Sequence, residues 1–159
     1  MNELVARSEL GVAFEEARRN GKRIVFTNGC FDLLHPGHIR LISRAASFGD
    51  RLIVAINDDA SVRRLKGDRR PIYPAEERAE ILLALRWVDY VTVFKEDTPS
   101  ETIQIVRPDV LVKGGEYLQR DIVGATFVTS YGGRVVRVPM MRGQATRRIV
   151  QRLSGATET

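Results

Sequence analysis

The chain has two histidines, His35 and His38, and both lie in one turn, three residues apart. If a helix begins at this turn, residues at that spacing project from the same side of it. Two imidazoles placed in this way can donate hydrogen bonds to a single triphosphate. A lone histidine is usually a packing residue, but packing gives no reason for both histidines to share a turn. The pair is therefore predicted to be catalytic and to contact a nucleotide.

The residues around the histidines suit a phosphate-binding turn. The segment reads Thr27-Asn28-Gly29-Cys30-Phe31-Asp32-Leu33-Leu34-His35-Pro36-Gly37-His38. Gly29 permits a tight turn, Pro36 fits the first turn of a helix, and Gly37 lets backbone approach a ligand closely. This arrangement predicts free helix amides beside a phosphate-sized space. The residues predicted to line the nucleotide site ahead of the histidines are Thr27, Asn28, Gly29, Cys30 and Phe31.

The elements that must position this turn follow from hydrophobic periodicity. Apolar runs predict buried strands at Ile24–Thr27, Leu52–Ile56, Tyr90–Phe94, Val110–Lys113 and Val135–Val138. Helical patterns occur at Val12–Arg19, Gly37–Phe48, Ala75–Leu85, Pro99–Val106, Ile122–Tyr131 and Ala145–Leu153. The alternation predicts an α/β fold: a single Rossmann-like domain with a mostly parallel five-stranded sheet and helices on both faces. Residues 1–22 are expected to form a helical extension and residues 154–159 a flexible tail.

Ligands of such sheets bind beyond the carboxyl ends of the strands, so the loops that follow strands are the ones to search. The stretch Asp58–Tyr73 gives the weakest pattern, with five basic residues around Gly67 and two prolines after them. It is interpreted as a mobile basic loop with a short helical start. Lys66 in this loop could fold over a triphosphate or grip an acceptor phosphate. The alternative is a solvated loop charge.

Composition narrows the class of protein. Of the 159 residues, 43% are hydrophobic and 28% charged, which is ordinary for a globular enzyme. The single cysteine, Cys30, excludes an internal disulfide and a cysteine-rich zinc site. No signal peptide and no apolar run long enough to span a bilayer are visible. We expect a soluble cytoplasmic protein with no membrane partner.

The net charge of +5 would favour polyanionic ligands, although scattered surface arginines often serve only solubility. A basic nucleic-acid-binding module is the alternative from another functional class. Its basic residues would be expected to interleave with aromatic side chains that stack on bases, and no such pattern is visible. No nucleic-acid partner is therefore predicted.

The turn from Thr27 to His38 resembles the HxGH signature of the cytidylyltransferase-like nucleotidyltransferases. Further segments between Arg23 and Leu153 are similar to the adenylyltransferases that make ADP-heptose. They include Ala60–Gly67, Arg70-Pro71, Glu77-Arg78-Ala79, Val88–Val91 and Pro108–Tyr117. Lys113-Gly114-Gly115 followed by an acidic and an aromatic residue fits this heptose branch, whereas glycerol-phosphate cytidylyltransferases usually carry a different sequence there.

The resemblance implies roles for further residues. Its predicted catalytic residues are His35, His38 and Lys66. Asp32, Lys66 and Arg78 are predicted to contact the acceptor. The nucleotide site is predicted to include Lys113, Gly114, Gly115, Arg142, Gly143, Thr146 and Arg147. No protein metal ligand is expected, because Mg²⁺ would arrive with the triphosphate. The resemblance also implies a homodimer and a separate heptose kinase.

The start of the last helix departs from the family pattern, which has an acidic residue, Gly, any residue, Ser, Thr and Thr. This chain has Arg142-Gly143-Gln144-Ala145-Thr146-Arg147. A serine hydroxyl is missing at Ala145, and we hypothesise that Arg142 and Arg147 replace it as donors to phosphate. The alternative is that Arg147 faces solvent and that Thr146 suffices with the helix amides.

The resemblance to the ADP-heptose-forming branch implies transfer of AMP from ATP to D-glycero-β-D-manno-heptose 1-phosphate, giving ADP-heptose. A sugar phosphate is already an anionic nucleophile, so direct in-line attack on the α-phosphorus needs positioning and electrostatic stabilisation rather than a general base. The alternative keeps the fold and changes the substrates to CTP, or another nucleoside triphosphate, with an alditol phosphate or another sugar phosphate.

Overall fold

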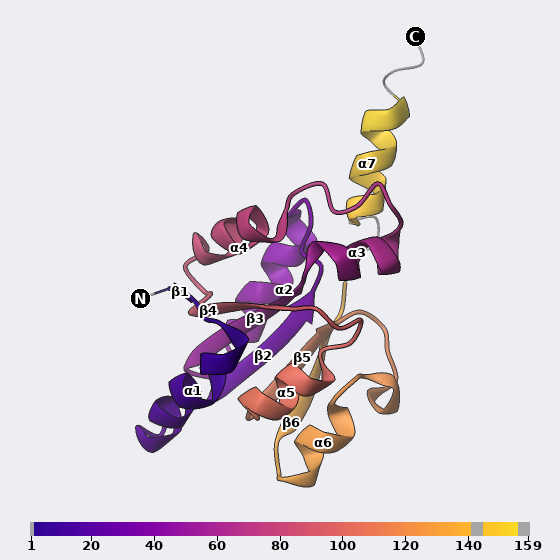
Figure 1. Cartoon of the computed structure of the whole chain (residues 1–159). Coiled ribbons are helices and arrows are strands. Elements are labelled where there is room, and N and C mark those ends of the chain that lie inside the picture. The colour runs from indigo at the N-terminus through magenta and orange to yellow at the C-terminus, as the bar shows by residue number, and fades with distance from the viewer. Residues whose placement is uncertain (1, 141–144, 156–159) are drawn as a thin grey trace.

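A buried sheet of parallel strands forms the centre of the chain (Figure 1). The structure is a computed structural model, and it describes residues 2–140 and 145–155. The strands are β1 (Glu3–Leu4), β2 (Ile24–Gly29), β3 (Arg51–Asn57), β4 (Tyr90–Phe94), β5 (Val110–Gly114) and β6 (Arg134–Val138). Their order across the sheet is β1-β4-β3-β2-β5-β6.

Alternating side chains of the strands build a hydrophobic core on each face of the sheet. In β3, Leu52, Val54 and Ile56 pack on one face, whereas Ile53 and Ala55 pack on the other. All five are at most 1% exposed. This two-sided burial explains why the central strands are near-continuous apolar runs.

Helices cover both faces, as predicted. They are α1 (Leu10–Arg19), α2 (Pro36–Ala46), α3 (Asp59–Lys66), α4 (Ala75–Leu83), α5 (Ser100–Val106), α6 (Ala125–Ser130) and α7 (Thr146–Gly155), with short 3-10 turns η1 (Arg7–Glu9) and η2 (Gln119–Asp121). Side chains of α2 and α4 join the core that contains Leu52. Side chains of α1, α5 and α6 join the core that contains Ile53.

Two elements differ from the sequence-based expectation. The sheet has a sixth strand, because Glu3 and Leu4 pair with Tyr90 and Val91 of β4. Residues 2–22 are therefore built into the fold, with Leu10 and Phe14 fully buried, rather than forming only a helical extension. The stretch interpreted as a basic loop begins with two turns of helix, α3, and only residues 67–74 form the loop.

The strand order places the histidine turn at a reversal of the chain. From β2 the chain proceeds outward through β3 and β4, and then returns to place β5 on the other side of β2. Ligands bind beside such switch points, at the carboxyl ends of the strands. The segment after β2 and the glycines that end β5 lie at this point, so the topology brings two predicted parts of the site to one place.

Candidate active site

The turn after β2 adopts an unusual backbone before α2 begins. Phe31 and Leu33 have positive φ values of 47° and 52°, a conformation that L residues seldom adopt. Phe31 is buried, and its ring lies 5.2 Å from that of His38, centroid to centroid. A Cβ atom at Gly29 would lie 3.2 Å from the Phe31 ring, so the ring packs closely on this glycine.

The two imidazoles cap the helix that they begin. The Nδ1 atom of His35 accepts a hydrogen bond from the Gly37 amide at 3.1 Å, and the Nδ1 atom of His38 accepts from the His35 amide at 3.4 Å. The rings stack with centroids 3.9 Å apart. A neutral imidazole that accepts at Nδ1 carries its proton on Nε2. Both rings therefore have an Nε2–H group available to donate to a ligand.

Burial keeps both imidazoles neutral. It lowers the pKa of His35, and it lowers that of His38 to about 4, helped by the positive charges of Arg70 and of His35 when His35 is protonated. Protonating either ring would add a hydrogen at Nδ1, where a backbone N–H already points. The pair is thus set as two neutral hydrogen-bond donors at neutral pH, rather than as two positive charges.

The capping bonds also revise the predicted set of free helix amides. Pro36 has no N–H, the Gly37 amide is bonded to His35 Nδ1, and the Ile39 amide donates to the His35 carbonyl at 3.2 Å. Among the described residues, only the His38 amide of this first turn has no partner. The expectation of several free amides at this turn is wrong, because Pro36 has no N–H and the other two amides are bonded to His35, one to its ring and one to its carbonyl.

Asp32 joins the turn to the loop after α3. Its carboxylate accepts from the Ile72 amide at 2.7 Å, the Tyr73 amide at 3.0 Å and Arg70 Nε at 2.7 Å. Burial alone would raise the pKa of this carboxyl, but these three donors outweigh it and lower the pKa. The side chain is fully buried, so the predicted direct contact with an acceptor gives way to a role in holding the loop.

Arg78 is a second buried brace. Its guanidinium donates to the Tyr73 carbonyl at 2.9 Å, the Cys30 carbonyl at 2.7 Å and Asp59 Oδ1 at 2.8 Å. With a side chain that is 0% exposed, it cannot touch an acceptor in this structure, contrary to expectation. It instead fixes α4 to α3 and to the turn after β2. This bracing role of Arg78 with Asp59, like the ion pair of Arg70 with Asp32, was not found from the sequence, because these contacts form only when separate segments of the chain fold together.

Two lysines supply positive charge near the turn. Lys66 is the last residue of α3 and is exposed. Lys113, near the end of β5, is partly buried, and burial lowers its pKa. The charge of Lys66 lowers the pKa of Lys113 and also that of the Cys30 thiol. Burial has the larger effect on the thiol, so the pKa of Cys30 is raised overall. The structure thus brings the two predicted lysines near each other and near Cys30.

The glycines after Lys113 lie close to neighbouring side chains. A Cβ atom at Gly114 would lie 2.8 Å from Met140 Sδ, and one at Gly115 would lie 2.7 Å from the Tyr117 ring. Gly115 also has a φ of +118°. A surface pocket of about 470 Å³ begins here, lined by Gly115, Glu116, Gln119, Val135, Val136, Arg137 and Pro139.

The last helix reaches the site at its first residue. Thr146 Oγ1 donates to the Asp32 carbonyl at 2.8 Å. Arg147 is exposed, while Arg142 and Gly143 lie outside the described residues. Of the residues at the end of β2, Thr27 is fully buried and its hydroxyl has no partner among the described residues. Asn28, Gly29 and Cys30 are partly exposed.

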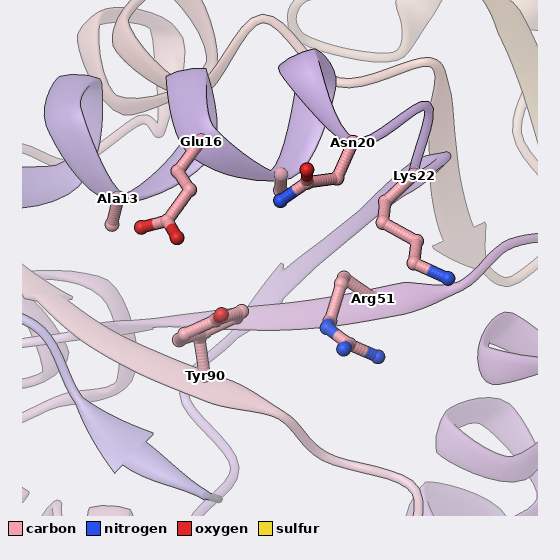
Figure 2. Close-up of a pocket in the computed structure, with 7 residues that line it drawn as sticks. Ala13, Glu16, Asn20, Lys22, Arg51 and Tyr90 are labelled. Carbon is pink, nitrogen blue, oxygen red and sulfur yellow. The ribbon is translucent and has the colours of Figure 1, made fainter.

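A second pocket, of about 210 Å³, lies away from these residues. It is formed by α1 and the first residues of β3 and β4 (Figure 2). Its lining consists of Ala13, Glu16, Ala17, Asn20, Lys22, Arg51 and Tyr90. None of these is a predicted site residue, and the pocket lies at the amino ends of the strands, opposite the edge where such folds bind ligands.

Residues 26–143, which include the histidine turn and the glycines after β5, match the cytidylyltransferase-like family. The chain belongs to the cytidylyltransferase-like family. It is a nucleotidyltransferase, and the members of the family most informative about it are bifunctional proteins. The chain is 51% identical over 147 residues to the bifunctional protein HldE of Syntrophotalea carbinolica and 54% identical over 142 residues to that of Geobacter sulfurreducens. These matches cover 92% and 89% of the chain, but only 30% and 29% of the relatives.

Solved structures agree on the fold of this family member. A lipopolysaccharide core biosynthesis protein from Thermoplasma volcanium has a TM-score of 0.63 and 25% identity, and the match covers 78% of this chain and all of that one. Pantoate-beta-alanine ligase from Francisella tularensis has a TM-score of 0.69, with 94% of this chain and 73% of that one covered. At 15% identity the latter likeness concerns the fold alone.

The described residues contain no helix long and apolar enough to cross a membrane. They also contain no cluster of three or more His, Cys, Asp or Glu side chains that could hold a metal ion.

Proposed function

We propose that the chain transfers AMP from ATP to D-glycero-β-D-manno-heptose 1-phosphate, giving ADP-heptose and pyrophosphate. The observation that carries this proposal is the orientation of the histidine pair. Both Nδ1 atoms accept backbone hydrogen bonds, which leaves two Nε2–H donors on stacked, neutral rings beside the start of α2. Such preorganised donors can stabilise charge that develops on a phosphate in the transition state.

The reaction requires few steps from the protein. A phosphate oxygen of the acceptor forms a bond to the α-phosphorus of ATP, and the bond from that phosphorus to the bridging oxygen of the β-phosphate breaks. Pyrophosphate leaves with the electron pair of that bond. The acceptor is already an anion, so the protein need not remove a proton; it must hold two anions in line and reduce their repulsion.

Positively charged side chains can reduce the repulsion between the two anions. Lys66 and Lys113 lie near the histidine turn from two different elements, α3 and β5. Lys66 is exposed at the end of its helix, where it would be free to move toward a bound triphosphate, whereas Lys113 is partly buried. Mg²⁺ would enter with ATP and neutralise phosphate charge.

The relatives support the choice of acceptor and nucleotide. The chain is about half identical to proteins named HldE over nearly its whole length. The sequence Lys113-Gly114-Gly115-Glu116-Tyr117 is similar to the ADP-heptose-forming branch. The pocket beside Gly115 is large enough for a base or a sugar. The relatives are named bifunctional, so in them a second activity shares the polypeptide. This corrects the expectation of a separate kinase. We propose that a kinase activity, on the same polypeptide or on another, supplies the acceptor in the cytoplasm.

A second candidate keeps the chemistry and changes the substrates. The matched family is described as cytidylyltransferase-like, and the serine of the family pattern at the last helix is Ala145 here. CTP with an alditol phosphate or another sugar phosphate is therefore the alternative pair.

A substrate matrix tests the proposal. The purified chain is offered each of the four common nucleoside triphosphates with Mg²⁺ and each of a set of sugar and alditol phosphates, and pyrophosphate release is measured. The fastest release is expected with ATP and the heptose 1-phosphate. Preference for CTP with an alditol phosphate would select the second candidate, and no acceptor-dependent release with any pair would reject nucleotidyl transfer.

A further inference from the structure

The guanidinium of Arg70 is held at the candidate site by one of its three nitrogens. Its Nε atom donates to Asp32 Oδ2 at 2.7 Å. Arginine has five N–H groups, and it frequently pairs with a carboxylate through two of them side by side. Here the pair uses Nε alone, and the four terminal N–H groups of Arg70 bond to no other residue within 2–140 or 145–155.

Burial makes these terminal N–H groups good donors to a second anion. The side chain of Arg70 is 15% exposed, so little of it is in contact with solvent. The carboxylate of Asp32 already accepts from the Ile72 and Tyr73 amides as well as from Arg70. A charged group that is mostly removed from water is stabilised when its remaining N–H groups find acceptors.

Arg70 lies beside the turn that carries the histidines. Its positive charge lowers the pKa of His38 and acts in the same direction on the Cys30 thiol. Asp32, which holds Arg70, is itself part of this turn, and its backbone carbonyl accepts from Thr146 at the first residue of α7. The bond to Asp32 therefore places Arg70 where the loop after α3, the histidine turn and the start of α7 meet.

The histidine pair leaves a need for positive charge at this place. Burial lowers the pKa of both imidazoles, so at neutral pH they donate hydrogen bonds without carrying charge. A guanidinium stays protonated at any pH at which the chain is folded, and its planar fork matches two oxygens of a phosphate. Arg70 thus supplies a permanent cation beside two neutral donors.

We propose that Arg70 binds a phosphate group of a substrate through its terminal N–H groups and that Asp32 holds the guanidinium in place for this contact. Arg70 is then a binding residue, and Asp32 is a positioning residue. Either the triphosphate or the acceptor can supply the phosphate oxygens. The inference rests on the proposed function, because nucleotidyl transfer is what brings phosphate-bearing substrates to this turn.

Calorimetric titration of the full chain with one ligand at a time tests the contact without turnover. ATP with Mg²⁺ and the heptose 1-phosphate are each titrated alone. Arg70→Gln should raise the Kd of at least one of the two ligands roughly tenfold or more, the loss typical of a hydrogen bond between charged groups. The ligand that is affected identifies the phosphate that Arg70 binds. Arg69→Gln changes the exposed neighbour in the same loop and, as the control, should bind both ligands like the parent.

A second variant separates phosphate binding from the neutralisation of Asp32. Arg70→Lys keeps a positive charge that can pair with the Asp32 carboxylate, but it lacks the planar fork. It should keep most of the parent's free energy of unfolding in urea and still raise the same Kd about fivefold, the equivalent of one lost hydrogen bond.

Two results would overturn the inference. A folded Arg70→Lys chain that binds both ligands with the parent's affinity would show that Arg70 serves only to neutralise Asp32, and it would leave the proposed function intact. A parent chain that binds neither ATP nor the heptose 1-phosphate would overturn the inference together with the proposed function.

Discussion

The chemistry of His35 and His38 depends on which ring nitrogen carries the proton. Both Nδ1 atoms accept backbone hydrogen bonds, so both rings should be Nε2–H tautomers. These are the only histidines in the chain, which makes a nitrogen–proton correlation NMR spectrum easy to assign. We expect two unprotonated Nδ1 signals at pH 7 and a titration midpoint for His38 of about 4. An Nδ1–H tautomer, or a midpoint near the ordinary 6.5, would contradict the capping geometry.

The same lowered pKa predicts how stability changes with pH. Between pH 4 and 6.5 the unfolded chain binds a proton at His38 that the folded chain does not bind. The contribution of the neutral His38 imidazole to the free energy of unfolding is therefore fully present above pH 6.5 and is lost as the pH falls toward 4. Urea unfolding of the parent and of His38→Gln across this range should show a steeper loss in the parent.

Asp32 should contribute more to the free energy of unfolding than Asp97, an aspartate in an exposed ion pair. Asp32→Asn removes the charge that three donors surround and turns an amide N–H₂ group toward one of them. We expect a loss of about 2–4 kcal/mol in the free energy of unfolding, typical of breaking a buried, hydrogen-bonded charge pair. Asp97→Asn, which affects the exposed partner of Arg64, is the control and should cost less than about 1 kcal/mol. Equal effects in urea unfolding would show that the Asp32 brace is not needed.

At the residue scale, the sequence predicted the histidine turn as a candidate site but not how the turn is built. The histidine pair was visible because both histidines of the chain share one turn. Their use of Nδ1 as caps was not visible, since it depends on the backbone of the first helical turn. Asp32 and Arg78 looked like ligands for the acceptor because they are charged residues beside the motif. Only the folded chain shows that backbone groups, together with Arg70 and Asp59, satisfy them.

At the scale of elements, helix α3 sets the position of Lys66 and therefore which groups this lysine can contact. The helix places this lysine at its exposed end, close enough to Lys113 for its charge to lower the pKa of Lys113. Lys66→Ala should lower kcat roughly 10- to 100-fold and change nucleotide affinity much less, because a cation that acts on reacting phosphates works mainly in the assembled complex. Arg63→Ala, on the exposed side of the same helix, is the control and should leave kcat unchanged. Loss of affinity without loss of kcat would make Lys66 a simple binding charge.

The elements themselves were largely predictable. Five strands and six helices follow from apolar periodicity, because strands buried on both faces are continuous apolar runs. The strand β1 was not predicted, because two residues show no periodicity and their pairing with β4 joins segments more than 80 residues apart in the chain. The helix α3 was interpreted mainly as a loop because its mean character is basic, although its buried Ser61 and Val62 are on one side.

At the scale of the whole molecule, the strand order brings separate segments of the chain together at the candidate site. The reversal of strand order between β2 and β5 brings the histidine turn and Lys113-Gly114-Gly115 to the same edge of the sheet. The bond from Thr146 to Asp32 adds the start of α7 from the other end of the chain. The site is therefore made of segments that are far apart in sequence, and it exists only in the folded chain.

The most direct test of nucleotidyl transfer is to follow phosphorus through the reaction. Phosphorus NMR of ATP, Mg²⁺, the heptose 1-phosphate and the chain should show the monoester signal of the acceptor replaced by that of a sugar diphosphate, with one pyrophosphate formed for each acceptor consumed. His35→Ala and His38→Ala should each slow this conversion roughly 100-fold or more, the range for losing a transition-state donor, while remaining folded. Release of ADP and inorganic phosphate instead of pyrophosphate, or folded histidine variants that react at the parent rate, would contradict the account.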